Sequence, residues 1–100
     1  MEITINEIDF EWDDEKAEIN LRKHKVSFEE AVQVFFDDDR LERLDDFHSG
    51  CETRWQVIGK VRDVLFVVYT ERRESKRIIS ARKANTKERK KYYDHSLYLA

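Results

Sequence analysis

The sequence of 100 residues contains no proline, two glycines and a single cysteine. Proline and glycine mark most irregular loops, so their scarcity predicts a chain built mainly of helices and strands. A lone cysteine excludes an internal disulfide and a zinc site made of cysteines. No apolar run approaches the roughly 20 residues that cross a bilayer, and the N-terminus lacks the pattern of a signal peptide. We therefore expect one soluble, cytoplasmic domain over residues 1–100.

Charge is distributed unevenly along the chain. Residues 1–50 hold 6 Lys or Arg and 16 Asp or Glu, whereas residues 51–100 hold 13 and 6, so the net charge of -3 conceals an acidic and a basic half. The densest basic stretch, residues 76–93, carries eight Lys or Arg and one acid, Glu88. A basic half on a small domain favours a polyanionic ligand, above all nucleic acid. The alternative is a solvated surface whose basic groups pair with the acidic half.

Hydrophobic periodicity and capping signals predict the α+β class, with two N-terminal helices, an antiparallel sheet and a C-terminal helix. The first helix presents Ala17, Leu21 and His24 on one face. Three consecutive strands with short connections form an antiparallel meander. The expected helices begin at the cap Asp13, at a capping box of Ser27 with Glu30 and at a capping box of Asn85 with Glu88. The second of them ends at the acids 37–39. The expected strands cover residues 8–12, 41–46, 53–60, 64–70 and 77–83.

Strand alternation sorts the basic side chains of the last strand onto two faces, one of which must pack against the helices. Ile78, Ser80 and Arg82 share one face; Arg77, Ile79, Ala81 and Lys83 share the other. An arginine on a rigid sheet is well placed to hold phosphate through two hydrogen bonds. Basic and aromatic groups of neighbouring strands, namely Arg54 or Lys60 and Tyr69, would complete a site for single-stranded RNA. The alternative is pairing of one or two of these arginines with Glu52, Glu71 or Asp63 across strands.

RNA can be cleaved without a metal or another cofactor, because its own 2′-OH is the nucleophile. The protein must then supply a base, an acid and cations around the scissile phosphate. The three histidines, His24, His48 and His95, have no metal-ligand spacing, so no metal site is expected. His48, in the turn before the sheet, is the better acid or base, and a solvated loop histidine is the alternative.

Several blocks of the sequence closely resemble the BrnT toxins of type II toxin–antitoxin systems. They are FEWDDEK (10–16), KHKVSFEEAVQVF (23–35), DFHSGCETRWQVIGK (46–60), VVYTER (67–72) and RIISARKANTKER (77–89). The resemblance implies a fold similar to the RelE/ParE superfamily and a ribonuclease that arrests translation. It also implies neutralisation by a BrnA antitoxin of the ribbon-helix-helix class, in a heterotetramer. The chain departs from the family at Lys25, where a glycine usually supplies the left-handed turn between helices.

The resemblance also implies which side chains serve the site. Arg82 and Arg77 would hold the scissile phosphate, and Tyr92 would transfer a proton or stack on a base; His48, chosen above for its chemistry and not by the resemblance, is the alternative for that role. The other matching positions, which would bind the RNA backbone or stabilise transition-state charge, are Arg54, Lys60, Arg72 and Arg89; Lys83 and Tyr69 join the RNA-binding set from the strands. Three rival functions remain: a non-catalytic module that binds nucleic acid or the ribosome, a basic surface for an acidic protein partner, and a gyrase-directed toxin.

Overall fold

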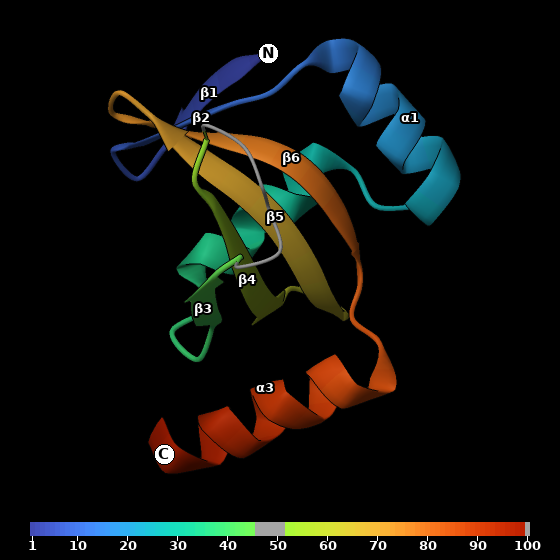
Figure 1. Ribbon diagram of the computed structural model, residues 1–100, viewed down its shortest axis with the longest axis vertical. Helices are drawn as coiled ribbons and strands as arrows, with labels where there is room; N and C mark the ends of the chain where they lie inside the picture. Colours follow the sequence, from blue (N-terminus) through green and yellow to red (C-terminus); the bar gives the residue numbers. More distant parts are fainter. Residues whose placement is uncertain (46–51, 100) are drawn as a thin grey trace.

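A computed structural model describes residues 1–45 and 52–99, and it contains a six-stranded sheet flanked by helices (Figure 1). The order of the strands across the sheet is β1-β2-β6-β5-β4-β3. The strands are β1 (Glu2–Ile5), β2 (Ile8–Glu11), β3 (Leu41–Leu44), β4 (Arg54–Lys60), β5 (Val64–Arg72) and β6 (Ser75–Lys83). The helices are α1 (Asp14–His24), α2 (Phe28–Ala31), the 3-10 helix η1 (Val32–Phe36) and α3 (Thr86–Leu99).

The predicted α+β architecture and the meander β4-β5-β6 are confirmed, because both strand pairs of the meander are antiparallel. The sheet as a whole is mixed, since β2 runs parallel to β6. The sequence analysis did not predict β1, which pairs with β2 across a tight hairpin. The two turn residues, Asn6 and Glu7, have φ angles of 49° and 69°, and Glu7 is not a residue that usually signals such a turn.

The main hydrophobic core lies between the sheet and α2 with η1. Phe28, Val32 and Phe35 of these helices pack in one cluster with Val67 and Ile78 of the sheet. The predicted cap Ser27 accepts a hydrogen bond of 3.0 Å from the Glu30 amide. The second helix ends before Asp37, as predicted, but its second half is 3-10 rather than α.

Gly59 of β4 lets η1 approach the sheet closely. A Cβ atom at this position would lie 2.8 Å from the Cβ of Val34. Real Cβ atoms do not approach so closely, so any larger residue would push η1 away from β4. The glycine therefore sets the distance between the main helical layer and the sheet.

Helix α1 covers the edge of β6 beyond the point where β2 ends. The Nδ2 atom of Asn20 donates to the carbonyls of Ala81, at 2.8 Å, and Val26, at 2.9 Å, and its Oδ1 atom accepts from the Ala81 amide at 3.2 Å. The side chain thus pairs with one strand residue as a neighbouring strand would. The face that carries Leu21 does not pack inward at that residue, which is 47% exposed, whereas Asn20 is buried against β6.

A β-bulge in β6 changes which side chains share a face. Val68 pairs with Ser80 and Tyr69 pairs with Ile78, so Ile79 is the extra residue of β6. Ile78 therefore lies in the main core with Ala81. The predicted grouping of Ile78 with Ser80 and Arg82 is wrong, because strict alternation ends at the bulge.

Candidate functional site

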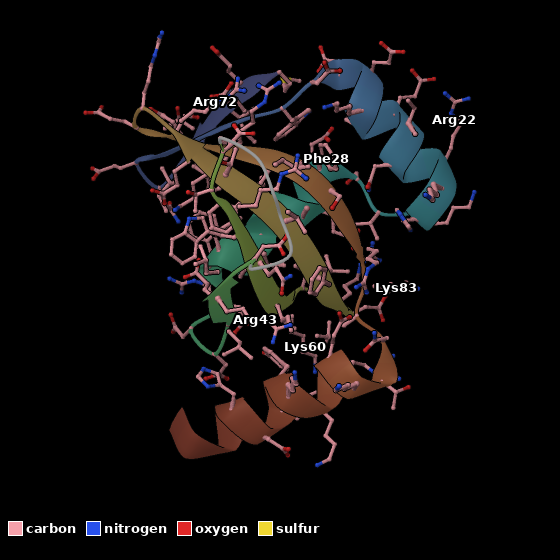
Figure 2. The ribbon with its side chains drawn as sticks, viewed as in Figure 1. Arg22, Phe28, Arg43, Lys60, Arg72 and Lys83 are labelled. Atoms are coloured by element: carbon pink, nitrogen blue, oxygen red, sulfur yellow. The ribbon has the colours of Figure 1, made fainter. Side chains whose placement is uncertain are left out.

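The sheet face opposite α2 and η1 gathers arginines from four strands. The strand registers place Arg77, Thr70 and Arg54 in one row across the sheet. The next row holds Ser80, Val68, Gln56 and Arg43, and the third holds Arg82, Phe66, Ile58 and Leu41. We call this surface the arginine face and define it by Arg43, Arg54, Arg72, Arg77 and Arg82. In Figure 2, Arg43 lies toward α3, whereas Arg72 lies at the far end of the sheet.

Arg82 is the most firmly held of these arginines. Its Nη1 and Nη2 atoms donate to the two carboxylate oxygens of Glu88 at 2.7 and 2.9 Å. Its guanidinium carbon also lies 4.2 Å from the centre of the Phe66 ring, which is a cation–π contact. The hydrogen bonds to Glu88 raise the pKa of Arg82. Burial opposes ionisation of Glu88, but the bonds from Arg82 and the Asn85 amide outweigh it and lower the pKa of this carboxyl.

The predicted capping box at the start of α3 is confirmed, and it connects to the arginine face. The Glu88 amide donates to Asn85 Oδ1 at 2.8 Å, and the Asn85 amide donates to Glu88 Oε1 at 2.9 Å. The carboxylate of Glu88 therefore both caps α3 and binds Arg82. From the sequence, Glu88 was predicted only to cap the helix. Its second partner, Arg82 on β6, is brought to it by the tertiary structure.

Carboxylates also pair with Arg77 and Arg72. Arg77 Nη1 lies 2.9 Å from Glu11, and Arg72 Nε lies 3.1 Å from Glu52. Lys83 lies 3.5 Å from Asp63. Two arginines of the last strand therefore do pair with carboxylates, but their partners are Glu11 and Glu88 and not the expected Glu52, Glu71 or Asp63. The arginine face combines cations with neighbouring acids, and a phosphate would have to share or replace these contacts.

Arg43 and Arg54 have no carboxylate partner among the described residues. Arg43 Nε donates to Gln56 Oε1 at 2.8 Å. The Nε atom of Arg54 is buried and, within residues 1–45 and 52–99, has no hydrogen-bond partner. Arg43 and Gln56 were not among the predicted site residues. Their pairing depends on the register between residues 41–44 and β4, which only the tertiary structure shows.

Tyr92 and Lys60 converge on Asp37, at the end of η1. The hydroxyl of Tyr92 donates to Asp37 Oδ2 at 2.6 Å, and the Lys60 amide donates to the same oxygen at 2.7 Å. Burial raises the pKa of Tyr92, and the bond to Asp37 adds to the rise. Burial acts against ionised Asp37, but the bonds from Tyr92 and the two backbone amides leave its pKa lowered. Tyr92 is 3% exposed, so its ring offers little surface for a base to stack on.

Two predicted RNA-binding residues lie off the arginine face. Tyr69 belongs to the main core, and its hydroxyl donates to Glu42 at 2.7 Å. The expectation that Tyr69 shares a face with the solvent-facing arginines of the last strand is wrong, because it points to the opposite side of β5 from Phe66. Lys83 pairs with Leu65, also a core residue, so its side chain starts on the helix side of the sheet.

Arg89 lies on the first turns of α3 and is exposed. Its Nη1 atom donates to the Ala84 carbonyl at 3.3 Å, so it supports the β6–α3 connection. His48 lies outside the described residues. Within the described part of the chain, no three His, Cys, Asp or Glu side chains gather as a metal site would require. The described helices include none with the length and apolarity to span a membrane.

Comparisons with known proteins identify the fold and the family. A family model described as "Ribonuclease toxin, BrnT, of type II toxin-antitoxin system" matches residues 12–88. The 1.1 Å crystal structure of the Brucella abortus ribonuclease toxin BrnT is similar with a TM-score of 0.56 and 22% sequence identity. The alignment covers 75% of this chain and 94% of that one. A comparison with curated proteins found no match.

Proposed function

Because the chain belongs to the BrnT family of ribonuclease toxins of type II toxin–antitoxin systems, we propose that it cleaves messenger RNA on its arginine face and so inhibits translation. The observation that supports this site is the convergence of Arg43, Arg54, Arg77 and Arg82 on one face of a rigid sheet. Guanidinium groups fixed in this way can bind successive phosphates and stabilise the charge that develops at the scissile one.

The proposed reaction needs no metal. The ribose 2′-oxygen loses its proton and attacks the adjacent phosphorus, and the bond from phosphorus to the 5′-oxygen breaks. The leaving 5′-oxygen gains one proton, which balances the one lost by the 2′-oxygen, so the products are a 2′,3′-cyclic phosphate and a 5′-hydroxyl group. Arg82 and Arg77 hold the phosphate, while Arg54, Arg72 and Lys60 bind the neighbouring backbone. The Tyr92 hydroxyl already donates a hydrogen bond to Asp37, and the pKa of Tyr92 is raised. His48 is therefore the first residue to test for proton transfer.

The test measures cleavage of a defined RNA by the purified protein, with and without EDTA. We expect cyclic phosphate ends, and we expect the rate to survive chelation; loss of the rate on chelation with rescue by Mg²⁺ would contradict the metal-free reaction. Arg82→Ala should strongly reduce the cleavage rate, to a low but measurable level, while leaving the fold intact. Arg22→Ala is the matched control, because Arg22 projects from the outer surface of α1 (Figure 2).

A non-catalytic RNA-binding module is the second candidate. It is favoured by the carboxylates that already occupy Arg77 and Arg82, since these pairs reduce the cationic charge free to act on a phosphate. A gel shift without cleavage products would support the binding module. Steep weakening of binding with salt would show that phosphates carry the interaction in either case.

A type II system implies an antitoxin partner. We propose that this partner is a BrnA-type protein with a ribbon-helix-helix domain and that the two form a heterotetramer in which the arginine face is inactive. Co-expression of the neighbouring small gene should relieve growth arrest, and the mass of the purified complex gives its stoichiometry. A neighbouring gene whose product neither binds nor protects would contradict this assignment.

A further inference from the structure

Arg82 is fixed on more sides than the other arginines of its face. Phe66 lies against the flat side of its guanidinium at 4.2 Å, Glu88 takes both terminal nitrogens, and the Lys83 carbonyl accepts from Nη1 at 3.2 Å. Arg77 and Arg72 each make one ion-pair contact with their acids. Arg82 is therefore held in one orientation by several contacts, whereas Arg77 and Arg72 are each held by one ion pair.

The fixed orientation leaves one edge of the guanidinium available. Nε and the second N–H of Nη2 form the side edge of an arginine, and this edge fits two oxygens of a phosphate. Glu88 binds the end of the group, through Nη1 and Nη2. Among the described residues, no acceptor is recorded for Nε of Arg82. The Nε–Nη2 edge is therefore the part of Arg82 that suits a phosphate while the Glu88 pair stays in place, and the Arg82 side chain is 36% exposed.

Glu88 is itself held in place. Its side chain is 13% exposed, and the capping box with Asn85 fixes it at the third position of α3. An acid that is already ordered loses little conformational entropy when it holds a second group. The first turn of α3 thus serves as a rigid mount for an arginine on β6.

We propose that Glu88 is a positioning residue of the RNA-cleaving site, which fixes Arg82 so that its Nε–Nη2 edge meets the phosphate. This inference rests on the proposed ribonuclease function. Glu88 acts through Arg82 and does not itself touch the substrate. Two other roles predict different results when the charge of Glu88 is removed. If Glu88 only caps the helix, catalysis should be unchanged. If Glu88 competes with the substrate for Arg82, catalysis should become faster.

Glu88→Gln separates these roles, because glutamine also serves in a capping box. It keeps one acceptor oxygen but loses the charge that holds Arg82. We expect kcat to fall by about tenfold to a hundredfold, as a misplaced catalytic group costs. KM should not rise, because the face loses one negative charge and attracts RNA at least as well. An unchanged kcat, or an increase in kcat/KM, would overturn the proposal.

Glu18→Gln is the matched control for charge. Glu18 lies 3.6 Å from Arg22 on the exposed side of α1, so this variant makes the same charge change away from the site. It should leave kcat at the wild-type value. In an Arg82→Ala background, Glu88→Gln should add little to the loss, because the two side chains act as one unit. An independent further loss in that background would contradict a role through Arg82.

A binding measurement keeps the inference separate from the ribonuclease proposal. The ¹⁵N signal of Arg82 Nε is followed while an oligonucleotide with 2′-deoxyribose, which cannot be cleaved, is added. The expected result is a shift in the wild type that is lost or much reduced in Glu88→Gln. The same shift in both proteins, or no shift in the wild type, overturns the positioning role. A wild type that shows the shift but never cleaves RNA overturns the ribonuclease function and leaves the positioning of Arg82 for phosphate intact.

Discussion

Tyr92 and Asp37 are 55 positions apart in the chain and share a hydrogen bond of 2.6 Å. The bond joins α3 to the end of η1, beside the small cluster in which Tyr92 packs with Ile58 and Phe66. Glu88 of α3 bonds to Arg82 of β6, which is a second polar link between this helix and the sheet. The docking of α3 therefore depends on polar bonds as well as on apolar packing.

Removing the Tyr92 hydroxyl should destabilise the protein. In Tyr92→Phe, Asp37 keeps its two backbone donors but loses the phenol, so the free energy of unfolding should fall by about 1–2 kcal/mol. Urea denaturation measures the change. Tyr93→Phe is the control, because Tyr93 is 45% exposed and its hydroxyl makes no hydrogen bond with a described residue. Equal effects of the two variants would show that the Asp37 bond contributes nothing.

Acid should weaken the fold through Glu88 and Asp37. Both carboxyls have a lowered pKa in the folded protein, against ordinary values of 4.5 and 3.8. As the pH falls, the carboxyls of the unfolded chain are protonated at their ordinary pKa values, before those of the folded protein. The stabilisation is therefore complete above the ordinary pKa values and is lost as the pH falls through the lowered pKa values of the folded protein. Urea midpoints between pH 7 and pH 3 would record the loss. Glu88→Gln should flatten the pH dependence; an unchanged curve would remove Glu88 from this account.

Asn20 should be among the most sensitive polar residues of the chain. Asn20→Ala leaves two buried carbonyls and one amide without their partner, and we expect a loss of about 3 kcal/mol or more. Gln33→Ala is the control, since Gln33 is an exposed amide on η1. Thermal denaturation compares the two. A loss for Asn20→Ala no larger than the control would mean that another group satisfies the edge of β6.

Lys25 offers a stabilising substitution. Lys25 ends α1 with φ 61° and ψ 25°. This left-handed conformation is energetically unfavourable for a residue that has a Cβ atom. Lys25→Gly should therefore raise the free energy of unfolding by up to about 1 kcal/mol. Lys23→Gly, two residues earlier and inside the helix, should lower it by a similar amount. If both glycines destabilise, the turn at Lys25 carries no strain.

Local signals were sufficient to predict most elements of the fold. Asp13, Ser27 and Asn85 each cap the helix that follows, because a cap depends on donors within three residues. The apolar run 64–70 became the central strand β5, since only a strand buried on both faces tolerates it. The conformation of Lys25 was also predictable, because a turn between two helices requires a left-handed residue there. The family resemblance, finally, was present in short blocks along the chain.

The arrangement of the arginine face depended on tertiary structure. The bulge at Ile79 shifts the phase of β6, and no rule of alternation shows where a strand gains a residue. It places Ile78 on the core face and Arg82 on the opposite face. The partners of the arginines come from distant segments: Glu11 lies 66 positions before Arg77. Sequence by itself determined that the chain would carry many cations on a sheet, since composition and periodicity are local properties. Which of them meet, and which carboxylate holds each one, was decided by strand order and register, which join residues that the sequence keeps far apart.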